Sequence, residues 1–302
     1  MEILKTNGLT KIYGKKAAVS NLNMNINKGD IYGFIGKNGA GKTTLIKMVV
    51  GLAAPTSGEI TLFGSRNLGK GRRNIGTVIE APAFAPNLSA RKNMYIQWQL
   101  LDSKNESIID ETLKLVGLDN VGKKKVKNFS LGMKQRLGIA MTLMGEPEFL
   151  ILDEPVNGLD PEGIIEVREL LLKLNHEKGL TILISSHLLS ELSRLATRYG
   201  IINDGVLIDE LSVEELEKRC KSSLKIKVND VEKACEVIKT QLNTENYKIL
   251  DDNTIELFDH LDESGIVNSI LAKNDIIINS ISTTKSDLES YFMKVIGGNK
   301  DE

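Results

Sequence analysis

The stretch GKNGAGKT, residues 36–43, decides the fold of this chain. It fits the pattern G-x-x-x-x-G-K-[ST]. An apolar run at Ile31–Ile35 precedes it and predicts a β-strand, and a helical pattern follows it from Lys42 to Gly51. In this context the glycines let backbone N–H groups turn inward around phosphate oxygens, and the positive end of the helix faces the same anions. The stretch therefore predicts a phosphate-binding loop rather than an ordinary glycine turn.

Two side chains of this loop and two of a later segment are expected to bind and hydrolyse a nucleotide. Lys42 is expected to reach the β- and γ-phosphates of a nucleotide, and the Thr43 hydroxyl to bind Mg²⁺. The stretch FLILDE, residues 149–154, is an apolar strand that ends in Asp153 and Glu154. Because ligands bind at the C-terminal ends of strands in open α/β sheets, we expect Asp153 to bind Mg²⁺ through water. Glu154 is then expected to orient or deprotonate the attacking water, the alternative being a solvated acidic turn after the strand.

The hydrophobic pattern indicates an α/β protein of two domains. In residues 1–210, continuous apolar strands such as 181–184 alternate with helices, which indicates a parallel sheet covered on both faces. Within this domain the period becomes helical over about residues 85–145, which predicts a helical insert. Residues 211–302 read in the order βαββαβ, which matches the ferredoxin-like α+β unit. We expect this small C-terminal domain to regulate the first or to contact another protomer.

Composition narrows the class of protein. Of the 302 residues, 41% are hydrophobic and 26% charged, which excludes a disordered or collagen-like chain. Lysine and arginine number 39 and aspartate and glutamate 40, so the net charge of −1 predicts no nucleic-acid partner. The two cysteines have no metal-ligand spacing, which favours a reducing compartment, although a single bridge between them stays open. No run approaches the roughly 20 apolar residues of a spanning helix, so we expect no direct membrane insertion.

These motifs together resemble the ATPase subunit of ABC transporters. Between the phosphate loop and Glu154 lies SLGMKQR, residues 130–136, which is similar to that family's signature motif, usually written LSGGQ. The stretch NGLD, residues 157–160, resembles the D-loop, and His187 resembles the switch histidine that contacts the γ-phosphate. Tyr13 lies where the family places an aromatic ring against adenine. The resemblance covers about residues 2–215.

The resemblance implies a P-loop NTPase of ABC type, with a parallel core sheet, an antiparallel β subdomain and a helical insert. It implies ATP as substrate, Mg²⁺ as cofactor and hydrolysis as the reaction, with Glu154, His187 and Lys42 as the catalytic residues. Thr43, Glu80 and Asp153 are implied for the metal. The residues implied for nucleotide contact are Tyr13, Gly36, Asn38, Gly39, Ala40, Gly41, Lys42, Thr43, Thr44, Ser130, Gly132 and Asp160.

Partners follow from the same resemblance. The family places its phosphate loop and signature on opposite faces, so two copies are expected to close head-to-tail over two ATP molecules. Ser130 and Gly132, at a helix start, would then donate to the γ-phosphate held by the other copy, while Ser130 also caps its own helix. Integral membrane permease subunits are implied as further partners, with a coupling helix docking near residues 80–95. The chain would then lie peripherally on the cytoplasmic face of the cell membrane.

One departure narrows the family. Most members carry glutamine after the strand that corresponds to residues 75–79, whereas this chain has Glu80. Such an E-loop resembles the bacitracin-type and lantibiotic self-protection subgroup, which exports peptide antibiotics. The alternatives are a neutral change in a transporter of an unrelated substrate, or a non-transport ABC-type ATPase that acts as a soluble regulatory or mechanical module.

Overall fold

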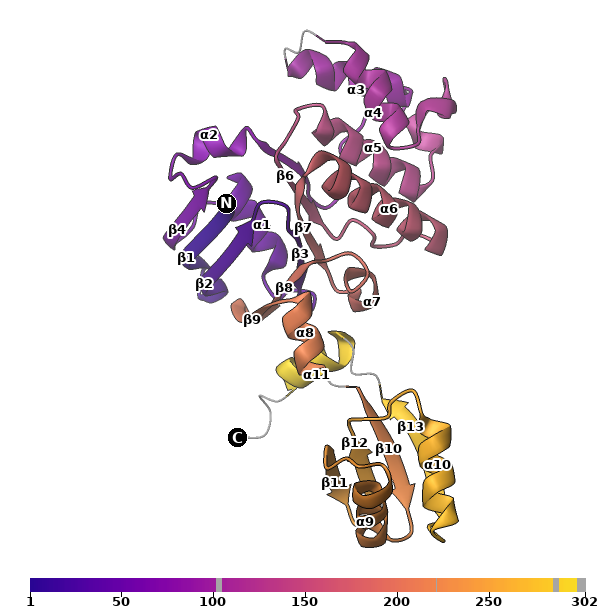
Figure 1. Cartoon of the computed structure of the whole chain (residues 1–302). Helices are drawn as coiled ribbons and strands as arrows, with labels where there is room; N and C mark the ends of the chain where they lie inside the picture. The colour runs from indigo at the N-terminus through magenta and orange to yellow at the C-terminus, as the bar shows by residue number, and fades with distance from the viewer. Residues whose placement is uncertain (102–104, 221, 285–287, 298–302) are drawn as a thin grey trace. The chain divides into compact units, whose positions relative to one another are not determined.

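A computed structural model describes residues 1–101, 105–220, 222–284 and 288–297 of the chain (Figure 1). The chain divides into two compact units, Met1–Val213 and Glu214–Glu302. Each unit has its own cluster of buried apolar side chains, which is the physical basis for the division.

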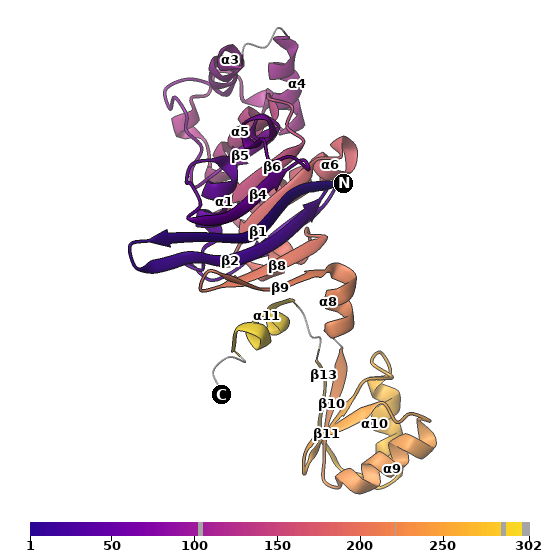
Figure 2. The same cartoon turned by 90° about the vertical axis from the view of Figure 1, so that its left-hand side faces the viewer.

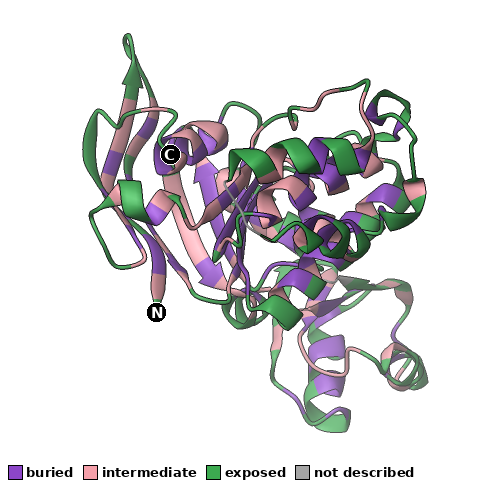
Figure 3. Cartoon of the chain, turned by 90° about the horizontal axis from the view of Figure 1, so that it is seen from above, coloured by how far each residue is buried: buried purple, intermediate pink, exposed green. Residues whose placement is uncertain are grey.

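The first unit is built on a six-stranded sheet in the order β5-β6-β7-β3-β8-β9. The first five of these strands run parallel, and β9 pairs antiparallel with β8 at one edge. Every residue of β3, β6 and β7 is buried, which explains their continuous apolar sequences (Figure 3). The bounds are β3 (Ile31–Ile35), β5 (Ile75–Val78), β6 (Phe149–Asp153), β7 (Thr181–Ser186), β8 (Arg198–Asn203) and β9 (Val206–Ser212).

A second, antiparallel sheet of the first unit has the order β2-β1-β4 (Figure 2). Its strands alternate buried and exposed residues, as expected for a sheet with one face on a core. Helix α1 (Lys42–Val50) contributes its apolar side chains to the core that this sheet shares with the parallel one. The strands are β1 (Glu2–Tyr13), β2 (Lys16–Asn27) and β4 (Ser57–Leu62). The helix that follows the phosphate loop is thus held between two sheets.

The remaining helices of the first unit include the predicted helical region. Helices α3 to α6 gather on one side of the unit in Figure 1, where α5 contacts both β5 and α6. Two short 3-10 turns, η1 (Asp119–Val121) and η2 (Val126–Asn128), precede α5. The helices are α2 (Leu68–Arg72), α3 (Ala90–Leu100), α4 (Ser107–Leu115), α5 (Leu131–Leu143), α6 (Pro161–Lys178) and α7 (Leu189–Leu192).

Glu210 of β9 links the two sheets by accepting hydrogen bonds from β3 of one sheet and β2 of the other. Tyr32 of β3 is fully buried, and its hydroxyl donates to Glu210 Oε1 of β9 at 2.8 Å. The same oxygen accepts from the backbone N–H of Asn25 on β2 at 3.2 Å. Burial, and then the Glu210 carboxylate, raise the pKa of Tyr32 well above its ordinary value, so this phenol stays protonated as the donor.

The Tyr32 hydroxyl leaves no room for a side chain on the neighbouring strand. A Cβ at Gly200 would lie 2.1 Å from that hydroxyl oxygen. Gly200→Ala is therefore expected to displace the ring and to lower the free energy of unfolding by about 1–3 kcal/mol. Urea unfolding followed by the fluorescence of the chain's one tryptophan, Trp98 in α3, measures the loss. Gly69→Ala, at a helical site with room for a methyl group, is the control. Equal unfolding midpoints for the two variants would contradict the prediction.

The second unit contains a four-stranded antiparallel sheet in the order β11-β12-β10-β13. Strand β10 alternates buried and exposed positions, and its buried residues share one core with α9 and α10. The order of elements along the chain is βαββαβ, as the sequence predicts. Its members are β10 (Ser223–Val228), α9 (Val231–Gln241), β11 (Tyr247–Asp251), β12 (Thr254–Leu257), α10 (Ser264–Lys273) and β13 (Ile278–Thr284), with α8 (Val213–Arg219) before them and α11 (Leu288–Gly297) after them.

Candidate functional site

Two glycines of the loop between β3 and α1, Gly36 and Gly41, have no room for a side chain. A Cβ at Gly36 would lie 2.6 Å from the backbone oxygen of Ile202, and one at Gly41 would lie 2.4 Å from that of Ala18. Gly41 also has a φ of +112°, a region that side chains avoid. Since Gly41 is the N-cap and has no capping side chain, the first N–H groups of α1 are left for an anion.

The other predicted loop residues differ in their exposure. Asn38 and Gly39 are exposed, and Gly39 has a φ of +83°. Ala40 is buried and accepts a hydrogen bond from the Gly205 N–H at 2.9 Å, which anchors the loop to the turn between β8 and β9. Thr44 is half-buried in the first turn of α1.

Lys42 is buried and reaches back across the loop. Its side chain is only 6% exposed, and its Nζ donates to the backbone oxygens of Gly36 at 2.6 Å and Lys37 at 3.3 Å. The same nitrogen lies 3.1 Å from Glu154 Oε1, a buried oxygen for which no hydrogen bond of good geometry is found among the described residues. This contact is therefore an ion pair, and the positive charge sits where the loop can present it to phosphate.

Asp153 lies beneath Thr43, between two hydroxyl groups. It is 4% exposed, and its Oδ2 accepts from the Thr43 hydroxyl at 2.7 Å. Its Oδ1 accepts from the hydroxyl of Ser185 on β7 at 2.5 Å. A carboxylate in contact with a hydroxyl at the foot of a phosphate-binding loop fits Mg²⁺, which prefers oxygen ligands and takes the rest from substrate phosphates and water. Among the described residues no group of three or more His, Cys, Asp or Glu side chains is placed to hold a metal ion.

Glu154 lies between Lys42 and His187. Its Oε2 is 2.8 Å from His187 Nδ1, and its Oε1 is 3.1 Å from Lys42 Nζ. Its φ of +51° is unusual for a residue with a side chain, and its N–H is held by Ser185. The structure thus brings together the acid, the lysine and the histidine that the sequence predicts from three separate segments.

Ser130 and Asp160 start two neighbouring helices. The exposed Ser130 caps α5 by accepting from the Met133 N–H at 3.2 Å, as the sequence predicts. Asp160 caps α6 and accepts from the Gly163 N–H at 3.0 Å. Gly132 is buried, and a Cβ there would lie 3.4 Å from the Gly163 Cα, so α5 and α6 approach closely at these ends.

Tyr13 and Glu80 lie at the periphery. Tyr13 ends β1 with 52% of its surface exposed, and Lys11 Nζ lies 4.9 Å from its ring centre. The Glu80 side chain is 70% exposed and its backbone has a φ of +60°. Its Oε1 pairs at 3.0 Å with Lys47 of α1, one helical turn after Thr43. The sequence analysis does not predict the contacts of Lys47 and Ser185 with the acids of the site. The two serines that end the apolar run of β7, Ser185 and Ser186, are a signal that could have identified Ser185.

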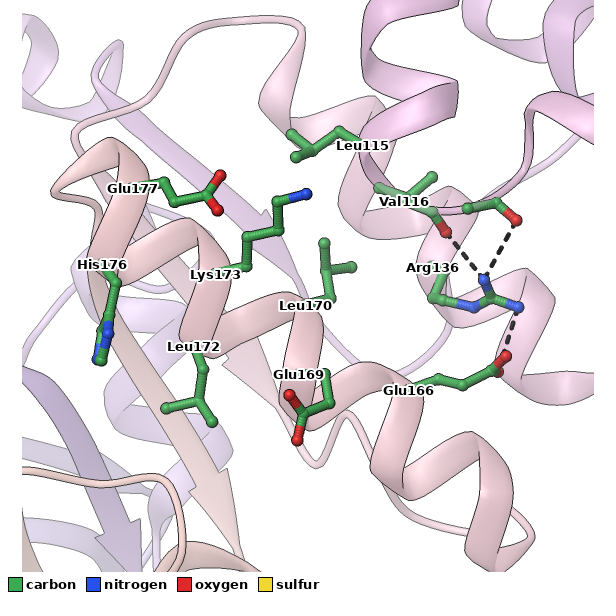
Figure 4. A pocket seen from close by; sticks show the side chains of 11 residues that line it. Leu115, Val116, Arg136, Glu166, Glu169, Leu170, Leu172, Lys173, His176 and Glu177 are labelled. Atoms are coloured by element: carbon green, nitrogen blue, oxygen red, sulfur yellow. Dashed lines mark hydrogen bonds and ion pairs between the residues drawn. The ribbon is translucent and has the colours of Figure 1, made fainter.

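A separate hollow of about 660 Å³ lies between α6 and the turn after α4 (Figure 4). Arg136 closes one end by donating to the backbone oxygens of Val116 at 2.9 Å and Gly117 at 3.3 Å, and it pairs with Glu166 at 3.2 Å. None of the predicted site residues lines this hollow. Its ion pair between Arg136 and Glu166 links α5 to α6.

Comparison with known proteins relates the chain to ATP-binding cassettes. A family model described as ABC transporter matches residues 19–157. The chain is 45% identical to the bacitracin transport ATP-binding protein BcrA of Bacillus licheniformis, over 98% of each chain. It is 50% identical to the lantibiotic transport ATP-binding protein SrtF of Streptococcus pyogenes, over 69% of this chain and 90% of that protein.

Solved structures of ATP-binding cassettes have the same fold as this chain. A dimeric cassette, MJ0796 bound to ADP and Pi, covers 70% of this chain and 99% of its own with a TM-score of 0.62 at 26% identity. A nucleotide-free cassette of an ABC transporter covers 72% of this chain and 94% of its own with a TM-score of 0.65 at 24% identity. These likenesses confirm the predicted P-loop fold of ABC type.

Proposed function

Because this chain belongs to the ATP-binding proteins of ABC transporters, we propose that it hydrolyses ATP to drive a peptide antibiotic out through separate permease subunits. Its relatives with bacitracin and lantibiotic transport in their names support that choice of substrate. Members of this family bind and hydrolyse ATP. The observation that carries the proposal is the meeting of Lys42, Glu154 and His187 beside the Thr43–Asp153 pair.

In this mechanism the loop amides and Lys42 hold the phosphates of ATP. Thr43 and Asp153 would hold Mg²⁺, whose charge neutralises phosphate oxygens when it is bound. Glu154 accepts the proton of the attacking water, and its distance of 2.8 Å to His187 Nδ1 supports a histidine that orients it. The same histidine is proposed to contact the γ-phosphate. Tyr13 offers a ring face to adenine.

We propose a second copy of the chain as the partner that completes each site. Ser130 is exposed at the start of α5, and Leu131 beside it is 51% exposed, which suits a surface that another copy covers. The N-terminus of α5 would then supply donors to the γ-phosphate held by that copy, with Gly132 and Asp160 nearby.

The permease contact is proposed at a hollow of about 300 Å³ beside Glu80. Its lining includes Ala81, Pro82 and Ala83, together with Gln97 of α3 and Met141 of α5. No helix among the described residues is long and apolar enough to cross a bilayer. A coupling helix of a permease that docks here would hold the chain at the cytoplasmic face of the membrane.

Glu80 is proposed to support the metal site through its charge. Glu80→Gln is expected to raise the Mg²⁺ concentration that half-saturates ATP hydrolysis by up to about fivefold, since exposed ion pairs are worth under about 1 kcal/mol. Resistance to the exported peptide should fall with it. Glu59→Gln, which breaks an exposed pair with Arg66, is the control. Unchanged Mg²⁺ dependence and unchanged resistance would make the E-loop neutral.

For the second unit we propose regulation of the cassette or contact between protomers. Each unit has its own core, so a chain that ends at Val213 is expected to fold. We expect this shortened chain to dimerise more weakly, or to hydrolyse ATP at a changed rate, in sedimentation and ATPase assays. The same dimerisation and the same rate as the full chain would rule out both roles.

The experiment that tests the function removes the protein and measures survival against a panel of cell-wall-active peptides. Deletion should sensitise cells to at least one peptide, and the intact chain, but not its Glu154→Gln variant, should restore survival. Unchanged survival across the panel would contradict peptide export. Recovery from gently solubilised cells without any membrane protein would instead favour a non-transport ATPase.

A further inference from the structure

Ser185 of β7 contacts both acids of the site through one hydroxyl group. The side chain is fully buried, and its Oγ donates to Asp153 Oδ1 at 2.5 Å. The same Oγ accepts from the backbone N–H of Glu154 at 3.0 Å. A hydroxyl has one hydrogen to donate and two lone pairs to accept with, so both bonds form at once.

The pairing of the strands makes this arrangement possible. Asp153 of β6 lies opposite Ser185 in the parallel ladder, which puts the two side chains on the same face. At Glu154 the chain leaves the strand with a φ of +51°, and its N–H turns back to Ser185, whose backbone oxygen it also reaches at 3.1 Å. The Ser185 hydroxyl therefore binds the backbone at the point where the chain turns away from β6.

Losing the hydroxyl would leave Asp153 Oδ1 without its donor and would weaken the hold on the Glu154 backbone. Asp153 is 4% exposed, so water does not easily replace a lost donor at Oδ1. Its other oxygen would keep only the Thr43 hydroxyl. A carboxylate freed on one side can rotate, and the backbone of Glu154 would keep a single bond to β7 in place of two.

We propose that Ser185 is a positioning residue that fixes Asp153 for the metal and Glu154 for the attacking water at the same time. The inference rests on the proposed function, because it assigns Ser185 to the metal and water sites of that ATPase. Ser185 is fully buried, and its role is exerted through the two acids that its hydroxyl contacts.

The experiment compares Ser185→Ala, Ser185→Thr and Thr181→Val in the full-length chain. Thr181 lies at the other end of β7, is fully buried and accepts from the Gly29 N–H at 3.0 Å. Its change to valine removes a buried hydroxyl from the same strand, away from the site. The readouts are Mn²⁺ affinity with ADP bound, measured by electron paramagnetic resonance without turnover, together with kcat, KM for ATP and thermal unfolding.

Ser185→Ala is expected to weaken Mn²⁺ affinity and to lower kcat, each by about tenfold or more, with KM for ATP nearly unchanged. Ser185→Thr, which keeps the hydroxyl, should recover most of both. Thr181→Val should lose stability without changing either. The proposal is overturned if Ser185→Ala matches Thr181→Val in all readouts, or if a stably folded Ser185→Thr is no better than alanine. A wild-type chain that hydrolyses no ATP would refute the proposed function instead.

Discussion

Replacing Glu154 with glutamine is expected to lower the rate of ATP hydrolysis by about 10²–10⁴-fold while ATP still binds. Glutamine keeps the size of the side chain but cannot accept a proton from water. Lys42 keeps its bonds to the loop, at 2.6 Å to the Gly36 oxygen, so the phosphate cradle persists. With turnover blocked and ATP bound, two copies should remain closed. Steady-state ATPase assays and size-exclusion chromatography with ATP measure the two effects.

Glu148→Gln is the matched control for this result. Glu148 directly precedes β6, whereas Glu154 directly follows it, so the two lie at opposite ends of this strand. Glu148 also pairs with a lysine, Lys28, at 3.5 Å. Its change to glutamine removes the same charge far from the loop, and the ATPase rate should stay at the wild-type value. A Glu154→Gln variant that hydrolyses ATP at the wild-type rate would remove Glu154 as the base.

Lys42→Met is expected to weaken ATP binding by about 100-fold or more. Methionine has a similar length and no charge. The Lys42 side chain is only 6% exposed. Hydrogen bonds that involve a charged group are worth about 1.5–3 kcal/mol, and methionine cannot donate them to the phosphates of ATP. Glu154 would also lose its ion pair at 3.1 Å, so hydrolysis should fall as well. Titration with a fluorescent ATP analogue measures the affinity.

The control for the lysine is Lys28→Met, which removes the same charge at the opposite end of β3. Its pair with Glu148 is half-exposed on both sides, so little affinity or stability should be lost. If Lys42→Met bound ATP as tightly as Lys28→Met, the loop amides alone would account for phosphate binding.

Local patterns made the site's parts predictable. The phosphate loop, the strand that delivers Asp153 and the order of elements in the second unit are all written in short stretches whose periodicity and glycines have direct physical meaning. The cap at Ser130 follows in the same way from a serine just before a helical pattern, and its bond to the Met133 N–H spans three residues.

Contacts between distant segments were not predictable from such patterns. Ser185 and Asp153 are 32 residues apart and meet because β6 and β7 pair in one register. Tyr32 and Glu210 are 178 residues apart, and neither stands in a motif. Only the resemblance assigns Glu80 to the metal, and that role stays a prediction. Its pair with Lys47 depends on the left-handed turn at Glu80, which no pattern marked.

The bond between Tyr32 and Glu210 sets where the chain can be cut. A fragment that stops before Glu210 loses the acceptor of a fully buried phenol, and an unsatisfied buried hydroxyl costs about 1–3 kcal/mol. A fragment that continues through Val213 keeps this acceptor and the whole of β9. A chain cut before Glu210 therefore has a destabilised edge strand, whereas a chain cut a few residues later, after Val213, keeps the edge strand intact. Fusion partners and tags belong after that strand.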